Sequence, residues 1–326
     1  MSLRSMLFQK NYHSETTGGV SNGCLNENIS QGRSYFNCSI TVYDCFFSRL
    51  SAIDLGGVIY VFGGSYTMSV SYSMFFNCIT TYSGAIFFDS YSSVLRMICA
   101  NKCSASSHYH FAYIQASNEN QIEFLSLSLC SHETSGYMSM FLSLGLQRLD
   151  NTNYSLNKAY MYSSIRISSQ TLFTSSYCTF MNNKVSYGIC IFFSPNTVTM
   201  SYANIINNNS PSNFGVLYVN GGTIHNMEFC VFQNNQNTLF FVESGSLEVS
   251  HSFISHINGI INQGTVSTSK NNTFIQKQTY VIQFYDSHYC KAEMPISIQK
   301  PINTMFDPLV STHLRTYSMI FPLILI

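Results

Sequence analysis

A short repeated segment constrains the fold of this chain more than any other feature. The sequence reads CTFMNN from Cys178 and CVFQNN from Cys230, and NIINNN, which starts at Asn204, lies between them. The apolar residues Phe180, Ile206 and Phe232 follow one another in steps of 26 residues. A fixed period of this length predicts a repeat architecture in which each unit stacks on the next.

Each repeat supplies three short strands and no helix. The apolar residue lies in the first strand, and a second strand opens with a glycine in several repeats, namely Gly57, Gly84, Gly188 and Gly215. A shorter third strand follows, as at 196–200 and 245–250. These segments are rich in β-branched and aromatic residues and lack helical periodicity. The pattern predicts an all-β fold, a right-handed parallel β-helix of about ten coils spaced about 4.8 Å apart.

Equivalent residues of a parallel β-helix stack directly above one another. The period therefore predicts an internal apolar column of Phe180, Ile206 and Phe232, and it predicts an asparagine ladder, in which side-chain amides bond from coil to coil. The expected ladder members are Asn183, Asn209 and Asn235. A leucine-rich repeat would need its L-x-x-L-x-L-x-x-N pattern, which is absent, and an antiparallel sandwich would not hold the 26-residue equivalence.

Proline marks the expected boundaries of the solenoid. Four of the six prolines follow Cys290, and proline cannot donate to a sheet ladder. We expect an irregular N-terminal cap at 1–39, repeats at 40–288 and a tail at 289–326. The final MIFPLILI is apolar but shorter than the about 20 residues that span a bilayer, so it begins a membrane anchor or forms a strand that caps the last coil.

Two motifs alternate in register along the repeats. G-G-A-[ILV] is matched by GGVI at 56–59 and, with one glycine, by SGAI at 83–86; F-x-x-N is met at Phe180 to Asn183 and at Phe232 to Asn235. Over roughly residues 40–285 this pairing resembles the repeats of polymorphic outer-membrane proteins of intracellular bacteria and related β-helix surface proteins of parasitic protists. The resemblance implies a solenoid of the pectin-lyase type and an adhesin-like protein at the cell surface.

Cysteines and sequons bear on the compartment. The eleven cysteines are an odd number, and Cys78 and Cys103 fall near one turn of adjacent coils, which makes them the candidate disulfide in an oxidising compartment. The N-terminal residues lack the apolar region of a signal peptide. Five asparagines are candidate N-glycosylation sites in a secreted chain: Asn28, Asn37, Asn153, Asn208 and Asn271.

Charge and motif content exclude several functions. Only 9% of residues are charged, with 15 basic and 15 acidic, so no basic patch for nucleic acid is expected. Glu243 and Glu248 flank one turn and are the nearest approach to the carboxylate pair of a glycosidase. His108 and His110 have a spacing that metals use, but no third ligand falls in register. We therefore predict no catalytic, cofactor-binding or metal-binding residues.

Three functional interpretations remain open. The first is a non-enzymatic surface or secreted scaffold that binds proteins or glycans through extended sheet faces rich in Tyr, Asn and Ser. The second is a carbohydrate-active β-helix enzyme, a polysaccharide lyase or a glycoside hydrolase. The third is a repeat spacer with no ligand. We expect the first, with an extracellular or cell-surface location and no cofactor.

Overall fold

The structure, a computed structural model, describes the chain from Asn22 to Lys270 with several gaps. The described ranges are 22–25, 28–29, 33–36, 38–52, 57–130, 136–169, 171–211, 214–222, 224–255, 261–262 and 265–270. The chain divides into two units, Met1–Met294 and Pro295–Ile326, and all described residues belong to the first. The expected tail at 289–326 lies outside the described residues.

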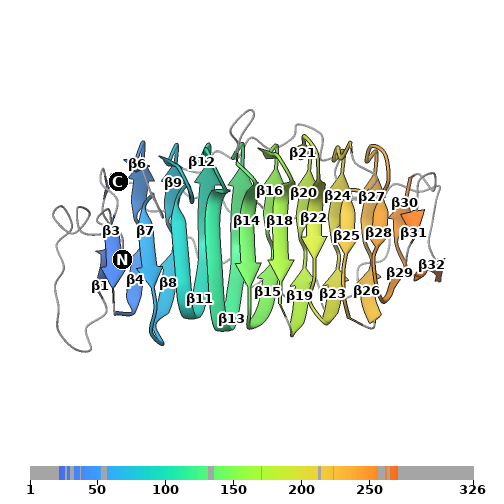
Figure 1. Cartoon of the computed structure of the whole chain (residues 1–326), viewed down its shortest axis with the longest axis horizontal. Coiled ribbons are helices and arrows are strands. Elements are labelled where there is room, and N and C mark those ends of the chain that lie inside the picture. Colours follow the sequence, from blue (N-terminus) through green and yellow to red (C-terminus); the bar gives the residue numbers. More distant parts are fainter. Residues whose placement is uncertain are drawn as a thin grey trace, which may run out of the picture. The chain divides into compact units, whose positions relative to one another are not determined.

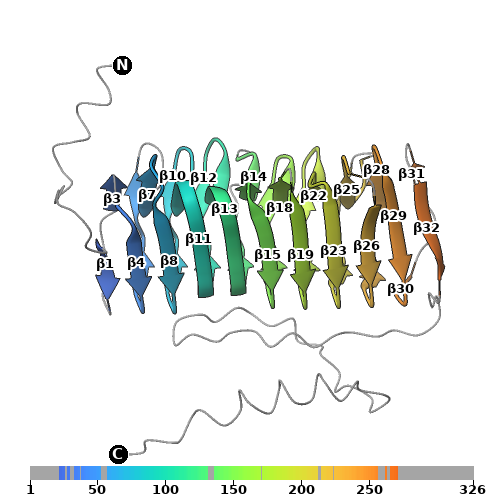
Figure 2. The same cartoon turned by 90° about the horizontal axis from the view of Figure 1, so that it is seen from below.

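Every described element is a β-strand, and the strands form three parallel stacks that we call sheets I, II and III (Figures 1 and 2). Sheet I contains β1 (Asn22–Leu25), β4 (Ile40–Tyr43), β8 (Thr67–Ser71), the middle of β11 (Ile86–Asn101) and of β13 (Tyr109–Ser128), β15 (Leu146–Asp150), β19 (Leu172–Ser176), β23 (Thr197–Ser201), β26 (Ile224–Glu228), β29 (Ser246–Ser250) and β32 (Thr265–Lys270). Sheet II contains β2 (Asn28–Ile29), β5 (Phe46–Ser48), β9 (Met74–Phe76), the ends of β11 and β13, β16 (Asn153–Ser155), β20 (Thr179–Met181), β24 (Asn204–Ile206), β27 (Val231–Gln233) and β30 (Phe253–Ile254). Sheet III contains β3 (Arg33–Phe36), β7 (Ile59–Phe62), the starts of β11 and β13, β14 (Met138–Ser143), β18 (Tyr162–Ser168), β22 (Ile189–Phe193), β25 (Leu217–Val219), β28 (Phe240–Val242) and β31 (Ile261–Asn262). Five two-residue strands lie between sheets II and III: β6 (Ser51–Ala52), β10 (Ile79–Thr80), β12 (Ser104–Ala105), β17 (Lys158–Ala159) and β21 (Lys184–Val185).

The parallel β-helix predicted from the repeat is confirmed, with about eight turns instead of the expected ten. The strands before Ile40 also join the stack, because β1, β2 and β3 pair in parallel with β4, β5 and β7. Residues 22–25, 28–29 and 33–36 therefore contribute strands to the solenoid, although an irregular cap was expected over 1–39. At the other end the last described strand is β32, and residues 271–288 lie outside the described part of the chain.

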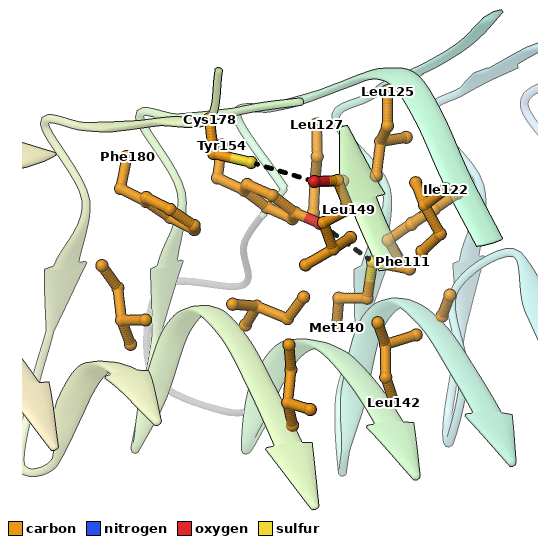
Figure 3. Packing of buried hydrophobic residues seen from close by; sticks show 14 of the residues in the cluster. Phe111, Ile122, Leu125, Leu127, Met140, Leu142, Leu149, Tyr154, Cys178 and Phe180 are labelled. Atoms are coloured by element: carbon orange, nitrogen blue, oxygen red, sulfur yellow. Dashed lines mark hydrogen bonds between the residues drawn. The ribbon is translucent and has the colours of Figure 1, made fainter. Parts of the chain in front are cut away.

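Sheet II supplies the central apolar column of the core. Its inward residues, in register from coil to coil, are Phe47, Phe75, Ala100, Leu127, Tyr154, Phe180, Ile205, Phe232 and Ile254. The rings of Tyr154 and Phe180 stack at 5.1 Å with an interplanar angle of 6° (Figure 3). Phe180 and Phe232 thus occupy the predicted column.

Ile206 does not lie in this column, which corrects the predicted register by one residue. Ile205 is fully buried and pairs with Phe180 and Phe232, whereas Ile206 is half-buried and pairs with Met181 and Gln233. The physical reason is an uneven coil length, since a coil of 25 residues is followed by one of 27. The two coil lengths average 26 residues, so a constant step of 26 predicts Ile206 at this position instead of Ile205.

In successive coils, the corners before and after sheet II are formed by residues in the left-handed backbone conformation. The first corner, three positions before the inward residue, is Asp44, Tyr72, Met97, Phe124, Asn151, Tyr177, Tyr202, Phe229 and His251. The second, two positions after it, is Arg49, Asn77, Lys102, Leu129, Leu156, Asn182, Asn207 and Asn234. All of these residues have positive φ angles, which let the chain turn sharply between sheets. Leu129 and Leu156 are corner residues of this kind although they are apolar.

The glycines that open sheet III lie where successive coils approach most closely. A Cβ atom on Gly84 would lie 1.9 Å from the carbonyl oxygen of His110, and one on Gly188 would lie 2.3 Å from that of Met161. Gly57 has the same role, because its Cβ would lie 2.5 Å from the Gly84 oxygen. Gly215 has φ +85°, a conformation that L side chains rarely adopt. Any side chain at these positions would separate or strain the coils.

Candidate functional site

An internal ladder of hydrogen bonds follows sheet II, three positions after each inward residue. Asn183 donates from its backbone N and from Nδ2 to Oδ1 of Asn208, both at 3.0 Å. Asn208 bonds Oδ1 of Asn235 in the same way, at 3.0 and 3.1 Å, and Asn157 donates its backbone N to Oδ1 of Asn183. The ladder therefore contains Asn183 and Asn235 as expected but Asn208 instead of Asn209, again because of the one-residue shift. Asn209 is half-buried beside it.

Cysteines continue this ladder in three earlier coils. Cys78, Cys103 and Cys130 point their thiols at the carbonyl oxygens of Phe47 (3.8 Å), Phe75 (3.5 Å) and Ala100 (3.8 Å), respectively. The asparagines direct Nδ2 at the equivalent carbonyls, as Asn183 does to Tyr154 at 2.8 Å. Side-chain contacts join Cys103 to both of its cysteine neighbours.

The candidate disulfide Cys78–Cys103 thus lies within a column of three buried thiols that the sequence analysis did not identify. In the structure all three cysteines are free. Because Cys78 and Cys103 occupy equivalent ladder positions on adjacent coils, an oxidising compartment is still predicted to link them. Burial raises the pKa of the Cys130 thiol, which makes this third member a weak nucleophile under ordinary conditions.

Two of the five predicted glycosylation sites are buried. Asn208 is fully buried and its amide nitrogen donates to the Phe180 carbonyl at 2.8 Å. Asn153 is also buried, and its amide nitrogen donates to the hydroxyls of Ser126 and Ser155. A glycan on either nitrogen would remove these bonds and has no room, so the structure contradicts both predictions. Asn37 and Asn271 lie outside the described residues, as does the side chain of Asn28.

The predicted acidic and histidine residues do not gather into one site. Glu243 accepts a hydrogen bond from the Tyr218 hydroxyl and lies after sheet III, whereas Glu248 lies on β29 of sheet I. His108 packs on Tyr82, with ring centroids 4.3 Å apart, while His110 is fully buried. In the described ranges, no group of three or more His, Cys, Asp and Glu side chains is arranged to hold a metal ion.

One pair of carboxylates was missed by the sequence analysis. Glu123 and Asp150 are register partners on neighbouring strands of sheet I, whose backbones are about 4.8 Å apart. Glu123 is ion-paired with Arg96 at 3.3 Å, and Asp150 accepts a hydrogen bond from Ser176. The two side chains are far apart in sequence, so only the correct coil register could have brought them together.

A row of mostly aromatic side chains lies on the outer side of the strands of sheet III, and four of its rings, those of Phe87, Phe192, Tyr218 and Phe241, are only 6% to 8% exposed. We call it the aromatic row; in register from coil to coil it consists of Tyr60, Phe87, Tyr113, Phe141, Arg166, Phe192, Tyr218 and Phe241. Neighbouring rings stack with centroids 4.8 to 5.4 Å apart and interplanar angles of 10° to 23°. The strands that carry them lie side by side in Figure 1.

A second set of rings lies at the adjacent corner and is more exposed. This corner row consists of Tyr82, His108, Tyr137, Tyr160 and Tyr187. The exposed fractions of Tyr137, Tyr160 and Tyr187 are 36%, 43% and 59%. Between the two rows, Tyr109, Met138, Tyr162 and Ile189 complete an apolar cluster that is separate from the core. Because these four side chains are buried, the exposed apolar surface of this region is that of the corner row, which is the candidate interaction site.

Polar side chains follow the other side of the aromatic row. This polar row lies two residues further along each strand and consists of Asp89, Gln115, Ser143, Ser168, Ser194, Asn220 and Glu243. Gln115 donates to Asp89 at 3.0 Å and accepts from the Tyr113 hydroxyl at 2.8 Å. Burial raises the pKa of the Asp89 carboxyl, although the Gln115 bond opposes the shift. We call the aromatic, corner and polar rows together the aromatic face.

No family model, curated protein or solved structure matches this chain. In the described part of the chain, no helix has the length and apolar character needed to cross a membrane.

The sequence contains a signal for the aromatic face that the repeat analysis did not use. Strands of sheet III such as IFF after Ala85 and ICIFF after Gly188 are apolar at inward and outward positions alike. A strand with one solvated face should alternate apolar and polar residues. Loss of alternation in several equivalent strands therefore indicates that both faces make apolar contacts.

Proposed function

We propose that this protein is a non-enzymatic repeat scaffold that binds a linear polysaccharide along its aromatic face. The observation that carries the proposal is the repetition of one ring and one polar side chain per coil. A surface that repeats every coil is complementary to a polymer that repeats along its own length, because each unit of the ligand meets the same chemistry. A folded protein partner has no such repeat.

The chemistry of the rows also supports a carbohydrate ligand. Within the aromatic row the rings cover one another's faces, so this row is rigid and presents ring edges. The exposed rings of the corner row are available to pack against the apolar C–H faces of sugars. The Ser, Asn, Gln, Asp and Glu side chains of the polar row can donate to and accept from sugar hydroxyls. Many weak contacts in series then give useful affinity without a deep pocket.

We further propose a location at the cell surface or outside the cell, in line with the resemblance to β-helix surface proteins. An adhesin-like role follows from attachment to extracellular polysaccharide.

Removal of exposed rings tests the proposal. The variant Tyr137→Ala/Tyr160→Ala/Tyr187→Ala should bind immobilised polysaccharides at least about tenfold more weakly than the unchanged protein, since loss of ring contacts worth about 1.4 kcal/mol in total gives that factor. The matched control is Tyr177→Ala/Tyr202→Ala, which removes a stacked pair, 5.0 Å apart, from the first corner of sheet II. Biolayer interferometry with heparin, polygalacturonate and dextran measures the affinities.

Two results would contradict the proposal. One is equal binding by the triple variant and the control. The other is release of new reducing ends from any of the polysaccharides, abolished by Asp150→Asn, which would favour the carbohydrate-active enzyme and assign the function to the Glu123–Asp150 pair of sheet I.

A further inference from the structure

The aromatic row contains one cation, Arg166, and it stands between rings on both sides. Its guanidinium carbon lies 5.4 Å from the ring centroid of Phe141 in the preceding coil and 5.1 Å from that of Phe192 in the following coil. The Tyr162 ring, on the same strand, is 5.2 Å away. These contacts hold the guanidinium by its two faces.

Among the described residues, Arg166 lacks the carboxylate partner that Arg96 and Arg148 have. Arg96 pairs with Glu123 at 3.3 Å and Arg148 pairs with Glu119 at 3.0 Å, both on sheet I. Arg166 makes no ion pair with a described residue, and its Nε atom is buried without a hydrogen-bond partner in the described structure. A buried N–H group without an acceptor lowers the stability of the protein, and an acceptor that bonds to it removes this cost.

Among the described residues of the aromatic face, the two acidic side chains are too distant to neutralise this charge. Asp89 and Glu243 belong to the polar row three coils to either side, about 14 Å along the axis. Both are already engaged, Asp89 by Gln115 and Glu243 by the Tyr218 hydroxyl. The centre of the aromatic face is therefore positively charged.

Three serines adjoin the charge. Ser168 lies two residues after Arg166 on the same strand face, and Ser143 and Ser194 occupy the equivalent positions in the neighbouring coils. A guanidinium stacked between rings presents its N–H groups at its edge, where it can bind a planar carboxylate or a sulfate through paired hydrogen bonds. The hydroxyls of Ser168 and Ser194 can donate further bonds to the same anion, whereas the hydroxyl of the buried Ser143 already donates to Gln115.

We infer that Arg166 is the anion-binding point of the aromatic face and that the ligand is an acidic polysaccharide, one that bears carboxylate or sulfate groups. This inference rests on the proposed function and narrows its ligand class. The alternative is that Arg166 only continues the stack, with its charge solvated and no part in binding.

The test uses the full chain and three immobilised probes. Heparin carries sulfate and carboxylate groups, polygalacturonate carries carboxylates alone, and dextran is neutral. We expect tighter binding to one or both acidic probes than to dextran, and at least a tenfold loss of that binding in Arg166→Gln. Arg166→Lys should recover part of the affinity, because it keeps the charge but not the paired geometry. The matched control Arg148→Gln, which removes an ion-paired arginine from sheet I, should change affinity less than twofold.

The outcomes separate this inference from the proposed function. Binding that is lost in the Tyr137, Tyr160 and Tyr187 variant but unchanged in Arg166→Gln would overturn the role of Arg166 and leave the binding face in place. Equal affinity for dextran and the acidic probes would also overturn the role of Arg166 and leave the binding face in place. Equal losses in Arg166→Gln and Arg148→Gln would show only a general charge effect and would also overturn it. Failure of all three probes to bind would overturn both proposals.

Discussion

Replacing Phe232 with alanine is expected to lower the free energy of unfolding by about 3–5 kcal/mol, the range for deletion of a fully buried phenylalanine side chain. Phe232 is fully enclosed between Ile205 and Ile254 in the column of sheet II, and its ring meets that of Phe240 edge-on at 5.0 Å. The cavity would open between three coils. Because coils of a solenoid contact only their neighbours, the damage should stay near β24, β27 and β30.

Phe229→Ala is the matched control for this prediction. Phe229 lies three residues earlier, at the first corner, and its half-buried ring stacks at 5.1 Å on Tyr202 and on His251. Loss of an outward stack should cost about 1 kcal/mol. Urea denaturation gives the size of each effect and native-state hydrogen exchange gives its location. Equal losses for the two variants, or exchange that rises as much in β5 as in β27, would contradict the stacking order.

The second large effect is expected from Asn208→Ala, at about 3 kcal/mol or more. The change leaves the Asn183 N–H and the Phe180 carbonyl buried without their partners and breaks the bond to Asn235. Each buried group that loses its partner costs about 1–3 kcal/mol. The effect is therefore comparable with that of a core deletion although the side chain is polar.

Asn209→Ala provides a control one residue away. Asn209 is half-buried and lies outside the ladder, so its loss should be within the about 0.5 kcal/mol typical of sites that lack a special role. Thermal unfolding of the two variants side by side is sufficient to compare them. A larger loss in Asn209→Ala than in Asn208→Ala would restore the register with a constant 26-residue step.

The sequence allowed the three-strand coil to be predicted, because strand composition and the Phe180–Phe232 spacing are local and repeated. The register of the residues within one coil was harder to predict. In NIINNN, either isoleucine can follow Phe180 and any of three asparagines can follow Asn183, so the pattern itself is ambiguous by one residue. Burial of Ile205 and the bonds of Asn208 decide the question, and neither can be read from spacing.

The functional surface was harder to predict for a different reason. The repeat alignment follows inward residues, whose size the neighbouring coils restrict, while the aromatic row is outward and contains Arg166 among the rings. Likewise, Cys78, Cys103 and Cys130 occupy ladder positions through the same carbonyl contacts as asparagine, but their chemical type conceals the equivalence. Alignment of successive coils in the correct register would have revealed both the aromatic row and the cysteines of the ladder.

Hydroxyl-radical footprinting of the full chain, free and with saturating heparin, tests the central claim that the aromatic face binds an acidic polysaccharide. Mass spectrometry follows the oxidation of tyrosines at two separate places on the solenoid, one with exposed rings and one with half-buried rings. The account predicts that the ligand protects Tyr137, Tyr160 and Tyr187 of the corner row, while Tyr177 and Tyr202 at the first corner of sheet II oxidise as before. Protection of Tyr177 and Tyr202 with no change at Tyr137, Tyr160 and Tyr187 would contradict it.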